Sequence, residues 1–473
     1  MSNYIATIGV EVHVELKTKT KIYSNSTNGY GRMANSLTNV IDLGYPGTLP
    51  TLNEEVVNLA IKAATVLNCK IRKEMHFDRK NYFYPDIPKN YQITQFATPI
   101  GYDGYVEIDV DGEKKKIFIE EMHIEEDTCK STHRGEKTLL DFNRAGVPLI
   151  EIVTKPCMTT PIEAKKYLEK LRELLLYSDI SDCKMEEGSM RADANVSIRK
   201  KESDPYNTKA EIKNIGSISN VGLSIEKEIE RQAKLYDAGE TFKAQTRRFD
   251  DKLKDTVLMR VKETGNDYRY FPEPDIPFVI ITDERIKEVK ETIPMLPDER
   301  RKKYIELGIS DVNANKIVQN RSISNYLNEL LAEKIDFKEA SNLLLGDIQA
   351  YLNKNEKDIT DTTLTKERFI DLVNKMSDNT LTSKNLKDIL DKVLEEDKSI
   401  DSIMKECNIE NITDDSTIRE VIKKIIAANP ESVADYKAGH DRAIKFLMGQ
   451  VMKETKGGIN PKMAMDILTE ELS

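Results

Sequence analysis

Residues 8–16, IGVEVHVEL, alternate strictly between apolar and polar side chains. This period of two predicts a β-strand whose two faces differ chemically. The even-numbered residues are apolar, so Glu11, His13 and Glu15 share the opposite face. The N-terminal part of the chain is therefore expected to build a sheet with one apolar face and one polar face.

Four later segments also place polar residues on strands. These residues are Glu151 in segment 148–153, Arg191, Asp193, Asn195 and Ser197 in segment 191–198, Lys209, Glu211 and Lys213 in segment 209–213, and Arg260 and Lys262 in segment 258–262. One interpretation is an antiparallel sheet with an ordinary solvated face. Against it, Glu151 has no polar neighbour within its strand and needs a partner. The polar faces also hold little of the threonine and lysine usual on solvated sheets.

The polar residues on these strands suit one kind of chemistry. Carboxylates that converge with an imidazole form a site for a hard cation such as Mg²⁺ or Mn²⁺. Arginine and lysine between them suit phosphate oxygens. Together they predict a surface for phosphoryl transfer, where positioning and charge neutralisation carry the catalysis. The sequence has neither a Walker loop nor G-x-G-x-x-G, so a nucleotide would be held by metal and side chains on the sheet.

The segment IPMLP at residues 293–297 divides the chain into a mixed part and a helical part. We predict an α+β fold with three domains: a catalytic domain at 1–293, an all-α domain at 294–407 and a helical tail at 408–473. Within the first we expect three helices: one capped by Asn53 and running to about residue 68, one opened by a capping box from Thr160 to Glu163, and one over about 221–238.

Composition limits where the protein works and what surface it presents. Neither a run of about 18 apolar residues nor a secretory signal is visible, so we expect a cytoplasmic protein with no membrane contact. The five scattered cysteines form no C-x-x-C pair and are expected to be reduced. A formal net charge of −10 argues against positive potential over the whole surface, but it permits a local basic face.

Such a basic face is expected near the C-terminus. Between residues 437 and 462 six basic residues stand against two acidic ones, which suits contact with phosphates. The six are Lys437, Arg442, Lys445, Lys453, Lys456 and Lys462.

Six blocks occur in an order that points to a known family. They are IGVEVHVEL at 8–16, DRKNYFYPD at 78–86, HIEED at 123–127, DFNRAGVPLIEI at 141–152, KMEEGSMR at 184–191 and DYRYFPEPD at 267–275. In these blocks the chain closely resembles the B subunit of the bacterial aspartyl/glutamyl-tRNA(Asn/Gln) amidotransferases, and the resemblance covers essentially the whole length.

The resemblance implies both a fold and a reaction. The N-terminal domain would be a cradle whose sheet is similar to that of glutamine synthetase and the guanidino kinases. ATP would phosphorylate the side-chain carboxylate of misacylated Glu-tRNA(Gln) or Asp-tRNA(Asn), and ammonia would displace the phosphate. The implied partners are an amidase, the A subunit, which makes the ammonia from glutamine, a small C subunit that completes a heterotrimer, and the misacylated tRNA, which the tail would contact.

The resemblance also implies site residues. The family's metal ligands correspond to Glu11, His13, Glu126, Glu151 and Glu211. Lys80 corresponds to a lysine near the mouth where ammonia arrives, and with Glu11 and Glu126 it completes the expected catalytic set. By charge and position, the expected contacts to ATP phosphates are Arg79, Lys130, His133, Arg191, Arg260 and Arg269. Each of these arginines has a structural ion pair as its alternative.

The chain departs from the family at one loop. Many members carry two cysteine pairs suited to structural zinc, where this chain has Ser24, Ser26, Asn39 and Asp42. Without thiolates we expect no tetrahedral zinc.

Two other functions stay open on the sequence alone. One is a kinase or ligase that phosphorylates a free small carboxylate or guanidine, for which neither tRNA nor a long helical extension is needed. The other is a non-catalytic binding module, in which the acidic face is solvated and the basic tail docks RNA. Isolated Glu151 and the pair of Glu11 and His13 speak against the second.

Overall fold

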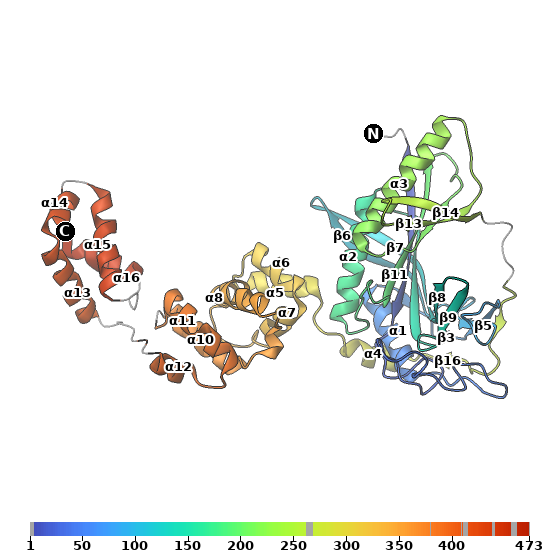
Figure 1. Cartoon of the computed structure of the whole chain (residues 1–473), viewed down its shortest axis with the longest axis horizontal. Helices are drawn as coiled ribbons and strands as arrows, with labels where there is room; N and C mark the ends of the chain where they lie inside the picture. Colours follow the sequence, from blue (N-terminus) through green and yellow to red (C-terminus); the bar gives the residue numbers. More distant parts are fainter. Residues whose placement is uncertain are drawn as a thin grey trace. The chain divides into compact units, whose positions relative to one another are not determined.

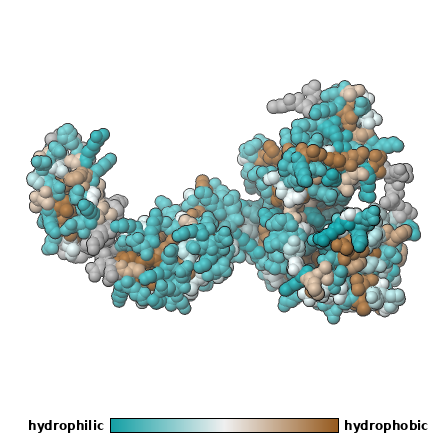
Figure 2. Space-filling model, in the orientation of Figure 1, coloured by the Kyte–Doolittle hydropathy of each residue, from teal (hydrophilic) through white to brown (hydrophobic). Residues whose placement is uncertain are grey.

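The structure is a computed structural model, and it describes residues 4–261, 268–378, 380–407, 409, 415–437, 440–455 and 461–472. The chain forms two compact units, Met1–Leu296 and Pro297–Ser473. Hydrophilic side chains cover most of the surface of each unit in the view of Figure 2.

The first unit is built on one large sheet (Figure 1). Its nine strands lie in the order β14-β13-β12-β11-β1-β10-β7-β6-β2. Their bounds are β1 Ile5–Glu15, β2 Lys70–Ile71, β6 Gly101–Val110, β7 Glu113–Glu126, β10 Pro148–Thr154, β11 Met190–Arg199, β12 Ala210–Lys213, β13 Gln245–Asp250 and β14 Asp255–Val261. The sequence predicted an antiparallel sheet, and one pairing differs because β12 and β13 run parallel. A connection containing a helix separates these two strands, which is what a parallel pair requires.

Strand β1 lies between β10 and β11 and has the predicted alternation. Val10, Val12 and Val14 are fully or almost fully buried on the apolar face. Helix α2 (Pro161–Tyr177) packs against β6 and against α3 (Ile218–Asp237), and α3 packs against β11. The helices thus cover the apolar face of the sheet and leave its other face to the polar side chains.

The three predicted helices of this unit are present. Asn53 caps α1 (Glu54–Val66) by accepting from Glu55 N, and Ser217 caps α3. At α2 the Thr160 hydroxyl accepts from Glu163 N. The predicted capping box is only half formed, because the Glu163 carboxylate accepts from Thr159 N, one residue before the cap. This contact still satisfies an amide close to the helix end.

Three smaller sheets and one helix complete the first unit. They are β15-β4-β5, β16-β3, β8-β9 and α4. Their bounds are β3 Glu74–Met75, β4 Asp78–Asn81, β5 Tyr91–Thr94, β8 Lys130–Arg134, β9 Lys137–Asp141, β15 Phe271–Pro272, β16 Val279–Ile280 and α4 Asp283–Glu291.

The second unit is helical in all its regular elements that the structure describes. Its bounds are α5 Pro297–Glu306, α6 Asp311–Gln319, α7 Arg321–Asn328, α8 Phe337–Leu343, η1 Leu344–Ile348, α9 Gln349–Lys354, η2 Ile359–Asp361, α10 Lys366–Ser377, α11 Ser383–Glu395, α12 Ile400–Glu406, α13 Asp415–Ala428, α14 Pro430–Lys437, α15 Asp441–Glu454 and α16 Pro461–Leu472. The last four helices share an apolar cluster of their own. The predicted boundary residue Asn408 lies outside the described residues.

Two further predictions concern the whole chain. Among the described helices, none is both long and apolar enough to span a membrane. All five cysteines are free thiols.

Candidate functional site

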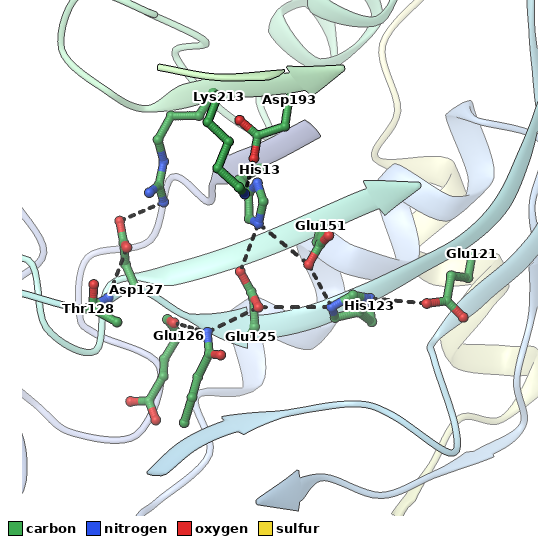
Figure 3. Close-up of polar contacts among 12 residues, drawn as sticks. His13, Glu121, His123, Glu125, Glu126, Asp127, Thr128, Glu151, Asp193 and Lys213 are labelled. Carbon is green, nitrogen blue, oxygen red and sulfur yellow. Dashed lines mark hydrogen bonds and ion pairs between the residues drawn. The ribbon is translucent and has the colours of Figure 1, made fainter. Parts of the chain in front are cut away.

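The polar face of the sheet brings two histidines and two glutamates together on three adjacent strands (Figure 3). Glu151 of β10 is the direct cross-strand partner of His13 on β1 and of His123 on β7. Its Oε2 lies 3.5 Å from His13 Nε2 and 3.1 Å from His123 Nε2. Glu125 Oε1 lies 3.5 Å from His13 Nε2. We call these four residues the histidine cluster.

Burial makes the histidine cluster electrostatically unusual. Glu125 is only 5% exposed, which an ordinary solvated sheet face would not produce. Burial raises the pKa of Glu125. For Glu151 burial acts in the same direction, but hydrogen bonds from His123 and His13 outweigh it and hold its pKa well below the usual range. Burial lowers the pKa of His13, yet Glu151 and Glu125 raise it to about 9. The two carboxylates therefore favour a positive charge at this position, which either a protonated His13 or a bound cation supplies.

A second group of carboxylates lies beside the histidine cluster on the same face. Glu11 of β1 is the cross-strand partner of Asp193 on β11, and Glu211 lies on the next strand, β12. One side-chain oxygen from each of these residues lies within 4.8 Å of the others. We call this trio the acidic cluster. Burial raises the pKa of Glu11, and the negative charges of Glu151, Glu211 and Asp193 raise it further.

The acidic cluster is held by neighbouring polar groups. Lys213 Nζ lies 2.6 Å from Asp193 Oδ2 and 3.2 Å from Glu211 Oε1. Asn195 Nδ2 donates to Glu11 Oε1 at 2.7 Å, and Thr246 Oγ1 donates to Glu211 Oε2 at 2.9 Å. These contacts orient the carboxylates toward a shared centre. Carboxylate oxygens with one imidazole are donors that Mg²⁺ and Mn²⁺ accept, so His13, Glu125 and Glu151 of the histidine cluster and the three residues of the acidic cluster fit a divalent cation.

The structure distributes the five predicted metal ligands over three places. His13 and Glu151 belong to the histidine cluster, whereas Glu11 and Glu211 belong to the acidic cluster. Glu126 joins neither: its Oε1 accepts from Ile93 N at 2.9 Å and forms an ion pair with Lys89.

Three cluster residues were missing from the predicted ligand set, namely His123, Glu125 and Asp193. The signal for the first two was the alternation of β7. Buried Met122 and Ile124 belong to the apolar face, so His123 and Glu125 occupy the polar face. Glu126 is in phase with Ile124, and this places its side chain on the other side of the sheet.

Next to the histidine cluster lies a cleft of about 790 Å³, which we call the His13 cleft. It is lined by His13, by five acidic residues and by five basic residues. The acidic residues are Glu15, Asp141, Glu186, Glu187 and Asp193, and the basic residues are Arg32, Lys130, Arg144, Arg191 and Lys213. Two of the predicted phosphate contacts, Lys130 and Arg191, are thus in it. Arg191 Nη2 lies 2.9 Å from Asp127 Oδ2. Burial raises the pKa of the Glu15 carboxyl to about 7.

The other predicted phosphate contacts lie outside the lining of the His13 cleft. Arg79 forms a bidentate ion pair with Glu273, at 2.6 and 2.9 Å, and a third contact with Asp275. This is the structural alternative that the sequence left open. His133 Nδ1 lies 2.9 Å from Thr138 Oγ1 on the β8-β9 hairpin. Arg260 is exposed on the edge strand β14, and Arg269 has positive φ in the segment before β15.

Lys80 lies on β4, with its Nζ 5.1 Å from the centre of the Tyr268 ring. Its charge also lowers the pKa of Glu125, although burial and other groups dominate there. The charge of Lys80 therefore acts on the histidine cluster, and its side chain contacts the Tyr268 ring.

The loop predicted to lack zinc is held by hydrogen bonds. Asp42 Oδ1 accepts from Ser24 Oγ at 2.6 Å, and Oδ2 accepts from Asn39 N at 3.0 Å. Lys21, fully buried, lies with its Nζ 3.3 Å from Asp42 Oδ2 and donates to Phe142 O at 3.2 Å. Ser26 N donates to Ser24 Oγ. A buried cation thus lies beside Asp42 in this loop.

The predicted tRNA-contacting residues lie in the second unit, on and around α15. Arg442, Lys445 and Lys453 are exposed on this helix, whereas Leu447 and Val451 are fully buried on its other side. Lys437 is exposed at the end of α14. Lys456 lies outside the described residues, as does the Lys462 side chain. The helix thus presents a basic stripe opposite its apolar face.

Comparison with known proteins covers both units. The family model described as "GatB/GatE catalytic domain" matches residues 6–287, and the model described as "GatB domain" matches residues 325–472. The B subunit of the aspartyl/glutamyl-tRNA(Asn/Gln) amidotransferase of Geobacillus kaustophilus is 48% identical over 472 residues, which cover 99% of each chain. The protein of the same name from Bacillus licheniformis is 47% identical over 473 residues, which cover 100% of this chain and 99% of that protein.

Proposed function

This chain belongs to the family of aspartyl/glutamyl-tRNA(Asn/Gln) amidotransferase B subunits, and on that premise we propose how its own residues perform the reaction. The chain is the catalytic subunit of a ligase that converts glutamate or aspartate esterified to tRNA into the amide, with ATP and with ammonia released from glutamine. Its partners are the amidase, or A subunit, the small C subunit and the misacylated tRNA. The location that fits a tRNA substrate is the cytoplasm.

The reaction has two balanced steps. A side-chain carboxylate oxygen of the tRNA-bound amino acid attacks the γ-phosphorus of ATP, so that a new O–P bond forms while the bond to the β–γ bridging oxygen breaks and ADP leaves. Ammonia then attacks the carbonyl carbon of the acyl phosphate, the C–O bond to phosphate breaks, and the nitrogen loses a proton. A free carboxylate resists ammonia, whereas the acyl phosphate carries a good leaving group.

The observation that carries this proposal is the cross-strand alignment of His13, Glu151 and His123, flanked by Glu125 and beside the acidic cluster. These residues and those of the acidic cluster would hold Mg²⁺ or Mn²⁺. When bound, such a cation neutralises charge on the phosphate oxygens. Lys130 and Arg191, which line the His13 cleft, bind and orient the phosphate chain.

Two finer aspects of the architecture belong to the same proposal. We assign the nine-stranded sheet to the kind found in glutamine synthetase and the guanidino kinases, because its polar face carries converging carboxylates. We assign residues 294–407 as the spacer domain and 408–473 as the tail, whose basic stripe on α15 contacts tRNA phosphates.

The test follows ADP formation by the purified heterotrimer, first without glutamine. With misacylated Glu-tRNA(Gln) or Asp-tRNA(Asn), we expect ADP to form in proportion to the misacylated tRNA, and added ammonium to convert the bound acyl group into the amide. Uncharged tRNA and free glutamate or aspartate serve as controls. ADP formation with the free amino acid, in the absence of tRNA, would favour a small-molecule kinase and contradict the proposal.

A further inference from the structure

A second cleft lies on the same polar face, on the other side of the two clusters. It has a volume of about 320 Å³, and Glu11 is part of its wall. We call it the Glu11 cleft. Glu11 and His13 lie two residues apart on β1, yet Glu11 lines this cleft and His13 lines the other. The two clefts therefore meet at the candidate metal centre.

The two clefts differ in the number of cations that they offer to a ligand. Five arginine and lysine residues line the His13 cleft beside five carboxylates, whereas among the described residues Lys209 is the one cation that lines the Glu11 cleft, together with the carboxylates of Glu11 and Glu120. A triphosphate carries several negative charges and is bound best where cations converge. The phosphate chain of ATP therefore belongs in the His13 cleft, and the Glu11 cleft is left for a ligand of lower negative charge.

The floor of the Glu11 cleft offers hydroxyl groups and open space. Thr7 and Ser197 are cross-strand partners, are 8% and 6% exposed, and have no hydrogen-bond partner for their hydroxyls within the described part of the chain. Buried hydroxyls that face a cleft are normally satisfied by ligand or water. Gly9 lies next to Thr7 on the same face of β1, opposite Asn195. A Cβ placed there would come no closer than 3.8 Å to another atom, so this glycine leaves the cleft unfilled.

The lip of the Glu11 cleft carries an aromatic ring. Tyr206 is 62% exposed, and the Arg199 guanidinium lies 4.7 Å from the centre of its ring. An exposed tyrosine beside a cation is a platform on which an unpaired nucleobase can stack. The next residue in the lining, Asn207, donates from Nδ2 to Ile198 O at 2.7 Å, and this hydrogen bond ties the segment that carries the ring to β11.

We propose that the Glu11 cleft binds the aminoacylated 3′-terminal nucleoside of the tRNA, with its base on Tyr206 and its aminoacyl group over Thr7, Gly9 and Ser197. This inference rests on the proposed function. It places the attacking carboxylate and the departing ADP on opposite sides of the γ-phosphorus, because phosphoryl transfer needs the two oxygens roughly in line. The volume of the cleft is near the lower end of ligand sites, which run from about 300 to 1,000 Å³, and it suits a nucleoside-sized group.

The first test fills the Glu11 cleft without disturbing the sheet. Gly9 has no positive φ, so Gly9→Val suits the strand and adds volume in the cleft. In the complete amidotransferase we expect the KM for misacylated tRNA to rise by about 10-fold or more, while the KM for ATP stays within about twofold. Gly9→Ala adds a single carbon and should have a smaller effect.

The second test uses the exposed ring and a small probe. The probe is 3′-glutamylamino-3′-deoxyadenosine, which carries the aminoacyl nucleoside through a stable amide. It should compete with misacylated tRNA and not with ATP. Tyr206→Ala should weaken its inhibition by about 10-fold, and Tyr206→Phe should preserve it, because the ring alone supplies the stacking.

Each outcome separates this assignment from the alternatives. A raised KM for ATP with an unchanged KM for tRNA would place the nucleotide in the Glu11 cleft and overturn the assignment. Unchanged constants in Gly9→Val and Tyr206→Ala would show that the cleft is unused, and overturn it as well. Failure of the proposed function would look different, because the unmodified complex would then form no amide from misacylated tRNA.

Discussion

His13 and Glu151 are direct cross-strand partners, and His13 Nε2 lies 3.5 Å from Glu151 Oε2 although 138 positions separate the two residues along the chain. Register between β1 and β10 fixes this contact, and the same register brings Glu151 to His123. Local sequence therefore supplies the side chains, and strand pairing turns them into a cluster. The predictions below test what each part of that arrangement does.

The first prediction tests whether the glutamates of the two clusters act as metal ligands in amide formation. Glu151→Gln, Glu125→Gln and Glu11→Gln each remove one charged ligand while preserving size. We expect each to lower kcat for tRNA-dependent amide formation by about 100-fold or more, since the lost stabilisation amounts to several kcal/mol. Glutamine hydrolysis by the amidase should continue. The measurements are the two rates in the same complex, with Mg²⁺ varied. Near-normal amide formation in all three variants would contradict the assignment.

The second prediction concerns Glu126, which the structure places outside both clusters. Its ion pair with Lys89 is buried, and removing one partner leaves an uncompensated charge. Glu126→Gln should therefore destabilise the folded chain by about 3–5 kcal/mol, and Lys89→Met in the same chain should recover part of that loss. Denaturant unfolding of the single and double variants measures this. A normal free energy of unfolding combined with a changed Mg²⁺ requirement would instead make Glu126 a metal ligand.

The third prediction concerns the loop that departs from the family. Asp42→Ala would leave Lys21 buried without its carboxylate, and burial already lowers the pKa of this lysine. We expect a loss of about 3–5 kcal/mol in the free energy of unfolding. Elemental analysis of the unmodified protein should find no stoichiometric zinc, because the loop offers no thiolate. One zinc per chain that survives dialysis would show that the loop uses other ligands.

Sequence alternation was sufficient to predict the polar face of the sheet, and four of the seven residues in the two clusters were among the expected metal ligands. The phase of a strand and the distance between two residues were harder to predict from the sequence. At β7 two consecutive glutamates compete, and only Glu125 is in phase with His123. Arg79 was assigned to phosphate because its charge was visible, whereas its partner Glu273 lies 194 positions away. Contacts of that range depend on the fold of the whole unit.

The order of the strands in the sheet also could not be predicted from the sequence. β12 and β13 are parallel neighbours, whereas the sequence predicted an antiparallel sheet and did not identify the β13 segment as a strand. The connection between them contains α3, and a helix of this kind returns the chain to start a strand in the same direction. Both strands support the acidic cluster, because Thr246 of β13 donates to Glu211 of β12.

The last prediction concerns the basic stripe on α15. Arg442, Lys445 and Lys453 are exposed, whereas the opposite side of the helix is buried, so replacing all three by alanine leaves the apolar cluster intact. We expect the KM for misacylated tRNA to rise. The slope of log affinity against log salt should become shallower by up to about 3, because each neutralised phosphate contributes roughly 0.9. The rate at saturating tRNA should fall much less, since the acceptor end reacts in the cradle.

A matched control uses three exposed lysines elsewhere in the second unit, Lys302, Lys338 and Lys354. Replacing these by alanine changes the net charge by the same amount, so any general effect of charge on tRNA attraction appears in both variants. A change in salt slope that is specific to the α15 variant therefore reports direct phosphate contacts. Equal slopes in the two variants would show that the basic stripe is an ordinary solvated helix face that does not contact tRNA phosphates. A lost turnover rate with an unchanged KM would instead mean that α15 positions the acceptor end for reaction.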